Sequence, residues 1–299
     1  MGCHGSPDKY PGIPHCFSVL RFLLNKNAYP ILICIRDSSR TGDFSLIRIG
    51  RLLPGGIAVE EGRHRPVKGI AILPSEDGET EEVIVFAKKI TSRAISTEIT
   101  CAALGRCLSL PVPEPVILFD EHDAPYFGSV DTAYPSFAQY ITNSSDEHFI
   151  KKLESWPLLR KAAFFDEWIA MDDRHDGNLL FNGDGFYLID HESAIPPGLS
   201  PEQTGIEYYS NQLLQIANAL LDRKNDISVQ MAANEARAWS VSCKTQSIEN
   251  LENLLSDSVE QKEKNHLIAF LTARIEILGD ILYDQIKPKQ VQINYDAKP

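Results

Sequence analysis

Residues 172–192 have the sequence DDRHDGNLLFNGDGFYLIDHE, in which two short apolar runs flank a turn rich in Asn and Gly. Such turn residues tolerate positive φ angles. The apolar runs, 179–181 and 186–189, therefore predict the two strands of a tight antiparallel β-hairpin. Folding the hairpin brings Asn178, which precedes the first strand, beside Asp190, which follows the second. A carboxylate and an amide oxygen then converge at the open end of the hairpin.

Two hard oxygen ligands of this kind suit Mg²⁺. Asp173 lies five residues before Asn178. A D-x-x-x-x-N loop followed by a hairpin and a second Asp is an arrangement that phosphoryl transfer uses. One Asp orients the nucleophile, while the Asn and the second Asp hold the metal on the phosphates. We therefore predict Asn178 and Asp190 as metal ligands and Asp173 as the catalytic base. Asp172 competes for that role, but its spacing to Asn178 is six residues.

Two questions stay open for this stretch. Asp, Asn and Gly are ordinary turn formers, so a purely structural hairpin is the alternative to a phosphotransferase site. His175 is a candidate catalytic residue that stabilises the transferring charge, and its alternative role is to brace the loop.

The stretch resembles the HipA-like branch of the protein-kinase-like superfamily, and less closely the phosphoinositide kinases, which share a D-R-H-x-x-N loop followed by I-D. Similar landmarks extend the resemblance to roughly residues 45–285; they are 110–115, 127–129 and 165–170. It implies an α+β, bilobal protein-kinase-like fold with an antiparallel β-sheet N-lobe, a mainly helical C-lobe, and ATP and Mg²⁺ in the cleft. Two residues depart from the pattern of many kinases. Met171 replaces the His of H-x-D, and His191 follows Asp190 where Phe is usual.

The resemblance also suggests where ATP binds. Residues 83–89 form an apolar strand whose V-x-A-K ending looks like the kinase strand that carries the ATP-binding lysine. We expect Lys88 to contact the phosphates, with Lys89 as the alternative. Glu98, at the start of a helical segment (98–107), is the expected ion-pair partner of Lys88.

Two further cofactor contacts are expected on the N-terminal side of the hairpin. The loop 61–69 contains Gly62, Arg63 and Arg65, which are placed to cap the ATP phosphates, although a solvated basic turn is equally compatible. Backbone groups near Phe127, Gly128 and Ser129 are the expected adenine contacts, because of their order along the chain.

The chain is predicted to contain an N-terminal extension, two lobes and a short tail: 1–44, an N-lobe at 45–135, a C-lobe at 136–286, and 287–299. Residues 200–202 look like a helix start, which leaves a short connection after Asp190. Helical spacings of three and four then predict four C-lobe helices at 213–221, 232–241, 248–255 and 267–282.

Composition limits the partners. The net charge is −12, and residues 1–70 carry +5, so the remainder carries −17. An acidic body of this kind argues against nucleic-acid and anionic-membrane binding. The six cysteines contain no C-x-x-C pair and indicate free thiols in a reducing, cytoplasmic compartment. No apolar run reaches the roughly 18 residues of a membrane-spanning helix.

These observations together predict an ATP- and Mg²⁺-dependent kinase of the HipA-like type that phosphorylates a Ser or Thr hydroxyl on a protein. The alternatives are a pseudokinase-like regulatory or binding module and a small-molecule kinase of the aminoglycoside type. The oligomeric state is not determined by the sequence.

Overall fold

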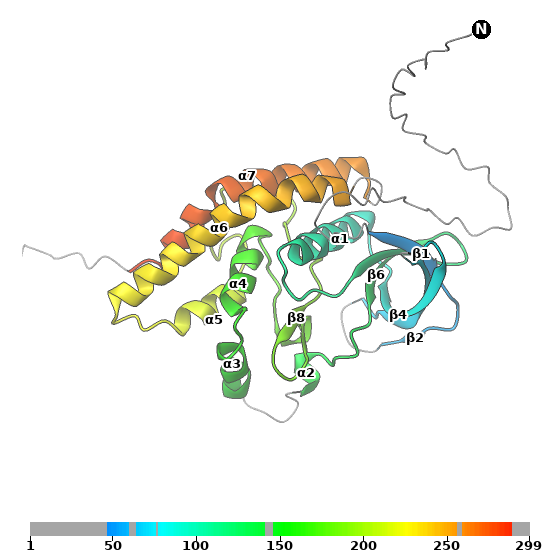
Figure 1. The fold of residues 1–299 in the computed structure, drawn as a ribbon, viewed down its shortest axis with the longest axis horizontal. Coiled ribbons are helices and arrows are strands. Elements are labelled where there is room, and N and C mark those ends of the chain that lie inside the picture. Colours follow the sequence, from blue (N-terminus) through cyan, green and yellow to red (C-terminus); the bar gives the residue numbers. More distant parts are fainter. Residues whose placement is uncertain (1–46, 60–63, 76, 141–145, 256–258, 289–299) are drawn as a thin grey trace, which may run out of the picture. The chain divides into compact units, whose positions relative to one another are not determined.

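The computed structural model describes residues 47–59, 64–75, 77–140, 146–255 and 259–288. Two compact units are distinguished along the chain, 1–31 and 32–299, and all the described residues belong to the second. The expected N-terminal extension, 1–44, lies outside the described residues, as does most of the expected tail. The described part combines α-helices and β-strands (Figure 1).

The first half of the described chain forms a small β-barrel. Its strands are β1 (Arg48–Leu52), β3 (Val67–Pro74), β4 (Thr80–Lys88), β5 (Pro115–Phe119) and β6 (Pro125–Val130). The order β1-β5-β6-β4-β3 closes because β1 also pairs with β3, while the short β2 (Ile57–Ala58) pairs with β3 outside the ring. Ala71, Val85 and Leu118 are among the side chains that fill the interior.

The expected antiparallel sheet is wrong in one respect, because β1 runs parallel to β5. The sheet also closes on itself, which was not predicted. Gly50 explains how β1 approaches β3 so closely, since a Cβ at this position would lie 2.2 Å from the carbonyl oxygen of Ile72. Glycine in a strand commonly marks such a close backbone approach.

Helix α1 (Ser92–Cys107) begins six residues before the predicted helical segment. The side chain of Thr91 caps it by accepting a hydrogen bond from the Ala94 amide at 3.3 Å. Residues 95–105 are all buried, because α1 packs against β5 and β6 and also against the last two helices. Its apolar side chains belong to the same core as those of the helical half.

The hairpin is present as predicted, with β7 (Leu179–Phe181) paired to β8 (Phe186–Leu188) in antiparallel register. A 3₁₀ turn, Asp176–Asn178, leads into β7. The buried face of the hairpin packs through Phe181 and Phe186 against Phe137 and Trp156, with ring centroids 5.0 to 5.4 Å apart. This aromatic packing fixes the hairpin on the helical half of the molecule.

Six α-helices complete the described chain: α2 (Phe137–Tyr140), α3 (Asp146–Glu154), α4 (Leu159–Trp168), α5 (Gln212–Ala219), α6 (Asp226–Leu254) and α7 (Gln261–Ile286). The long helices α6 and α7 lie side by side (Figure 1). The two helices predicted at 232–241 and 248–255 are one, because no Gly or Pro interrupts α6. None of the described helices is long and apolar enough to span a membrane.

Residues 191–211 contain neither helix nor strand. The helix start predicted at 200–202 is wrong. The side chain of Arg274 on α7 takes the carbonyl oxygens of Pro201 and Gln203, which a continuing helix would use internally. The connection after Asp190 is thus longer than expected.

Candidate active site

The end of β4, the middle of α1 and the residue after β8 bring three charged side chains together. Lys88 Nζ lies 3.2 Å from Glu98 Oε1 and 2.8 Å from Asp190 Oδ1. Glu98 is fully buried, whereas 14% of the Lys88 side chain and 27% of the Asp190 side chain are exposed. A buried carboxylate thus holds a lysine whose head remains partly accessible.

The electrostatic environment keeps both partners charged. Burial alone would lower the pKa of Lys88, but Glu98 and Asp190 outweigh it, so the pKa of this lysine is raised. Burial alone would raise the pKa of Glu98, but Lys88 and His191 hold it at about 2. Opposite charges at these distances favour the ionised forms.

The backbone around Asp190 is fixed from α1. Asp190 has φ 61, in the left-handed region that Asp tolerates better than most residues. The next residue, His191, donates its backbone N–H to Glu98 Oε2 at 2.8 Å. Glu98 therefore binds Lys88 with one oxygen and the Asp190 turn with the other.

Glu192 is a member of the site that sequence reasoning missed. Its carboxylate, that of Asp190 and that of Glu98 offer oxygens that lie within 4.8 Å of one another. Glu192 Oε1 pairs with His64 Nε2 at 2.8 Å, and Oε2 is buried without a hydrogen-bond partner among the described residues. The signal was present in the sequence as a second acidic residue two positions after Asp190.

Asn178 lies beside the Asp190 turn, since the Ile189 amide donates to the Asn178 carbonyl at 3.2 Å. Its side-chain Nδ2 donates to the Asp173 carbonyl oxygen at 2.6 Å. This bond fixes the orientation of the amide and leaves Oδ1 as its acceptor atom. The two residues predicted as metal ligands are therefore neighbours across the open end of the hairpin.

Arg174 is a second feature that the sequence did not reveal. Its guanidinium makes two 3.0 Å bonds to the Asp166 carboxylate on α4, and both side chains are fully buried. It also donates to the carbonyl oxygens of Asn178 and Ile189, one on each side of the hairpin. Arg174 thus fastens the open end of the hairpin to α4.

The three polar residues of the loop differ in what they contact. Asp172 accepts a hydrogen bond from the Ser210 amide at 2.7 Å. The Asp173 carboxylate is 57% exposed, and its Oδ1 lies 3.9 Å from His175 Nε2. His175 Nδ1 accepts from the Gly177 amide at 3.0 Å and so caps the 3₁₀ turn. Asp172 is engaged as a brace, whereas the Asp173 carboxylate faces solvent.

The remaining predicted contacts belong to the loop 61–69 and to β6. Gly62 and Arg63 lie outside the described residues, and Arg65 is exposed with φ 42. Phe127, Gly128 and Ser129 belong to β6, which pairs with β4 on one edge and β5 on the other. Their backbone groups take part in these two ladders, and the expected adenine contacts through them stay a prediction. The Val130 and Asp131 amides are paired as well.

No protein-family model and no curated protein sequence matches the chain. Among solved structures it is similar to a proinflammatory kinase, CtkA, from Helicobacter pylori. The identity is 12%, the TM-score is 0.46, and the match covers 79% of this chain and 96% of that chain. It is also similar to an N-terminal 618-residue fragment of LepB from Legionella pneumophila, at 14% identity and a TM-score of 0.42, covering 73% of this chain and 46% of that chain. Both TM-scores are below 0.5.

Proposed function

We propose that this chain is an ATP- and Mg²⁺-dependent kinase of the HipA-like type. The observation that supports the proposal is the convergence of Lys88, Glu98 and Asp190 from a strand, a helix and a hairpin. With Glu192, the site contains three carboxylates whose oxygens lie within 4.8 Å of one another, and two of them pair with the Lys88 ammonium group. A half-buried excess of negative charge is unfavourable unless a cation joins it, and oxygen ligands of this kind suit Mg²⁺.

The residues fit a metal ion in the way the proposal requires. Both oxygens of Glu98 are occupied by Lys88 and by the His191 amide, so this residue positions others. Asp190 and the Oδ1 atom of Asn178 would hold Mg²⁺, next to Glu192. Mg²⁺ bound there would neutralise charge on the ATP phosphates.

The chain's own groups then have separate tasks. Lys88 binds a phosphate oxygen, and Glu98 keeps its ammonium group in place. Asp173 accepts the proton of the acceptor hydroxyl, since its carboxylate is exposed and its backbone is tied to Asn178. His175 braces the loop and lies beside Asp173. Arg65, with Gly62 and Arg63, is proposed to contact the phosphates from the loop between β2 and β3.

The proposed acceptor is a Ser or Thr hydroxyl on a folded protein. Residues 191–211 expose two large apolar side chains, Ile206 at 84% and Tyr208 at 43%. In this proposal these two side chains contact the acceptor protein.

Calorimetric titration with ATP and Mg²⁺ tests the nucleotide site. Wild type is expected to bind ATP in a Mg²⁺-dependent manner, and D190A is expected to lose that binding. Unchanged affinity in D190A would refute the metal assignment. Nucleotide binding by wild type without transfer to any lysate component would instead favour the pseudokinase-like regulatory module.

Phosphoproteomics of cells that express wild type or D173A tests the acceptor. Phosphorylated Ser or Thr residues specific to wild type are the expected result. A wild-type-specific signal found only in lipids or soluble metabolites would contradict the protein acceptor and leave the kinase assignment standing.

A further inference from the structure

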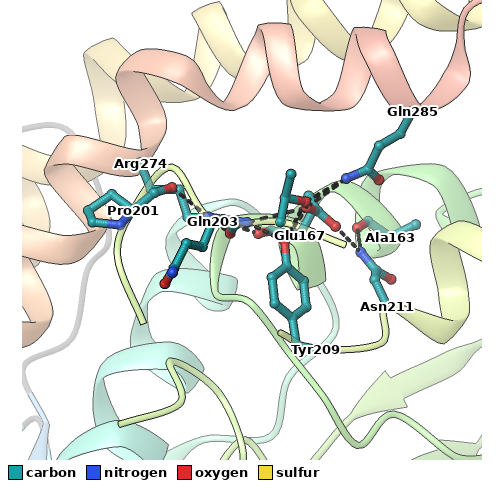
Figure 2. A network of polar contacts seen from close by, with 9 residues as sticks. Ala163, Glu167, Pro201, Gln203, Tyr209, Asn211, Arg274 and Gln285 are labelled. Atoms are coloured by element: carbon teal, nitrogen blue, oxygen red, sulfur yellow. Dashed lines mark hydrogen bonds and ion pairs between the residues drawn. The ribbon is translucent and has the colours of Figure 1, made fainter. Parts of the chain in front are cut away.

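Two adjacent acidic residues near the end of α4 each bind a buried arginine. Asp166 binds Arg174, which holds the hairpin that carries the proposed metal ligands. Glu167 binds Arg274 of α7, and the residues around this second pair form the network in Figure 2. The proposed mechanism gives the second pair no role, although both of its side chains are almost completely buried.

Arg274 uses all five N–H donors of its guanidinium. Nε donates to the Glu167 carbonyl oxygen at 3.0 Å, and Nη1 donates to the carbonyl oxygens of Pro201 and Gln203. Nη2 donates to Glu167 Oε1 at 3.3 Å and to the Tyr209 hydroxyl. Since lysine has three donors and no planar fork, it cannot reproduce this set.

Glu167 accepts hydrogen bonds from side chains at both ends of residues 204–211. Its Oε1 accepts from the hydroxyls of Thr204 and Tyr209, and its Oε2 accepts from Asn211 Nδ2 at 3.1 Å. Gln285 of α7 adds a 3.0 Å bond to Oε1. Figure 2 shows Arg274 and Gln285 of α7, and Tyr209 and Asn211 of the loop, converging on Glu167 of α4. A segment without helix or strand is thereby held to α4 and α7 by side-chain contacts.

The network continues to the catalytic loop through consecutive residues. Tyr209 binds Glu167, the Ser210 amide binds Asp172 Oδ1 at 2.7 Å, and Asn211 binds Glu167. Asp172 immediately precedes Asp173, the proposed base. The position of residues 209–211 therefore sets one end of the loop that carries Asp173, independently of Arg174, which sets the other.

We propose that Glu167, Arg274 and Tyr209 form a clamp that positions Asp173 for transfer, acting through Ser210 and Asp172 and leaving the nucleotide site unaffected. The clamp residues are positioning residues, because none of them contacts the proposed reacting groups. This inference rests on the proposed kinase function. It assigns the two buried arginines different tasks: Arg174 supports the metal ligands, and Arg274 supports the base.

The test uses the full chain with Y209F and R274K. Y209F removes one hydroxyl and leaves the Glu167–Arg274 pair, so the variant keeps its fold. In R274K we expect turnover to fall about 100-fold, as misplacement by about 1 Å can produce, and in Y209F we expect a smaller fall. ATP affinity measured by calorimetry should stay within about twofold of wild type in both.

The matched control is R237K. Arg237 of α6 forms an exposed ion pair with Asp280 of α7, and R237K should leave turnover unchanged.

A double-mutant cycle separates the clamp from general stability. If the clamp acts through Asp172, D172A and the combination Y209F/D172A should lose the same turnover. Additive losses, or wild-type turnover in folded Y209F and R274K, would overturn the proposal. Equal loss of turnover and ATP affinity would overturn it too.

Hydrogen exchange of the Ser210 amide tests the clamp without requiring kinase activity. The Ser210 amide should exchange faster in Y209F than in wild type and R237K. If wild type transfers phosphate to no acceptor, the kinase function fails, and unchanged Ser210 protection in Y209F would then refute the clamp itself.

Discussion

At the scale of single residues, the site depends on buried charges that are fully paired. The four side chains of the Asp166–Arg174 and Glu167–Arg274 pairs are at most 1% exposed. An isolated buried charge is costly, and a buried pair is tolerated only when its remaining hydrogen-bonding groups are satisfied. The guanidinium groups meet this condition by binding backbone carbonyls, so the same bonds that satisfy the charges also fix the loops.

The Asp166–Arg174 pair gives a prediction for stability. R174M should lower the free energy of unfolding by about 3–5 kcal/mol, because it leaves the Asp166 carboxylate buried without its partner. Urea unfolding measures the change. The control R160M breaks an exposed pair with Glu235 and should cost less than about 1 kcal/mol. Similar losses in the two variants would contradict the importance assigned to burial.

The two aspartates of the catalytic loop give a prediction for chemistry. D173N should lower turnover by about 10²–10⁴-fold, which is the usual contribution of a general base, while ATP affinity stays the same. Steady-state kinetics and calorimetry measure the two quantities. D184N, in the exposed turn of the hairpin, is the control and should behave as wild type. If D173N retained full turnover, Asp173 would not be the base.

At the scale of elements, the barrel and α1 together determine where Lys88 lies. β4 alternates between interior residues, Val85 and Ala87, and outward residues, Phe86 and Lys88. The outward face of the strand end meets α1, which presents Glu98 from the middle of a fully buried segment. The ion pair therefore joins α1 to the end of β4.

The interior of the barrel gives a prediction at this scale. A Cβ on Gly128 would lie 2.6 Å from Val116 Cγ2 and 2.7 Å from Leu118 Cδ1. G128A should therefore destabilise the protein by about 1–3 kcal/mol through overpacking. A Cβ on Gly69 meets its nearest atom at 3.4 Å, so G69A is the control and should be tolerated better. Thermal unfolding compares them, and equal stability of the two variants would argue against a tightly packed barrel.

At the scale of the whole described unit, one large core joins α1, the hairpin and the helices, and a smaller core fills the barrel. Of the three described thiols, those of Cys101 and Cys243 are buried and that of Cys107 is partly buried. Burial raises the pKa of Cys101, and it raises the pKa of Cys107 and of Cys243 to about 11 each.

The thiols give a prediction for the intact protein. In the variant C3S/C16S/C34S, the three remaining cysteines are Cys101, Cys107 and Cys243. At neutral pH they should react with a disulfide reagent more than about 100-fold more slowly than a free cysteine, since the thiolate is the reactive form. All three should react quickly in urea. Rapid labelling of the folded variant would show that this core opens.

The sequence by itself determined the hairpin and the neighbours that the hairpin creates. Its signals are local. Asn-Gly-Asp-Gly strongly favours a turn, and the flanking apolar runs are short enough to be strands. The pairing of Lys88 with Glu98 was also predicted, because strand and helix follow each other along the chain. Contacts between residues that are close in sequence, or joined by one turn, can be predicted without knowledge of the rest of the fold.

Only the tertiary structure decided the features that depend on distant contacts. Closure of the barrel requires β1 to meet β3 and β5, and nothing local in residues 48–52 reveals it. The irregular course of residues 200–211 follows from Arg274, more than sixty residues later, which takes carbonyls that a helix would have used. Glu192 and Arg174 likewise could be recognised as part of the site only from contacts in the folded chain. Burial and the choice of partner are properties of the folded chain. The sequence does not show whether a charged side chain is exposed to water or buried in the core.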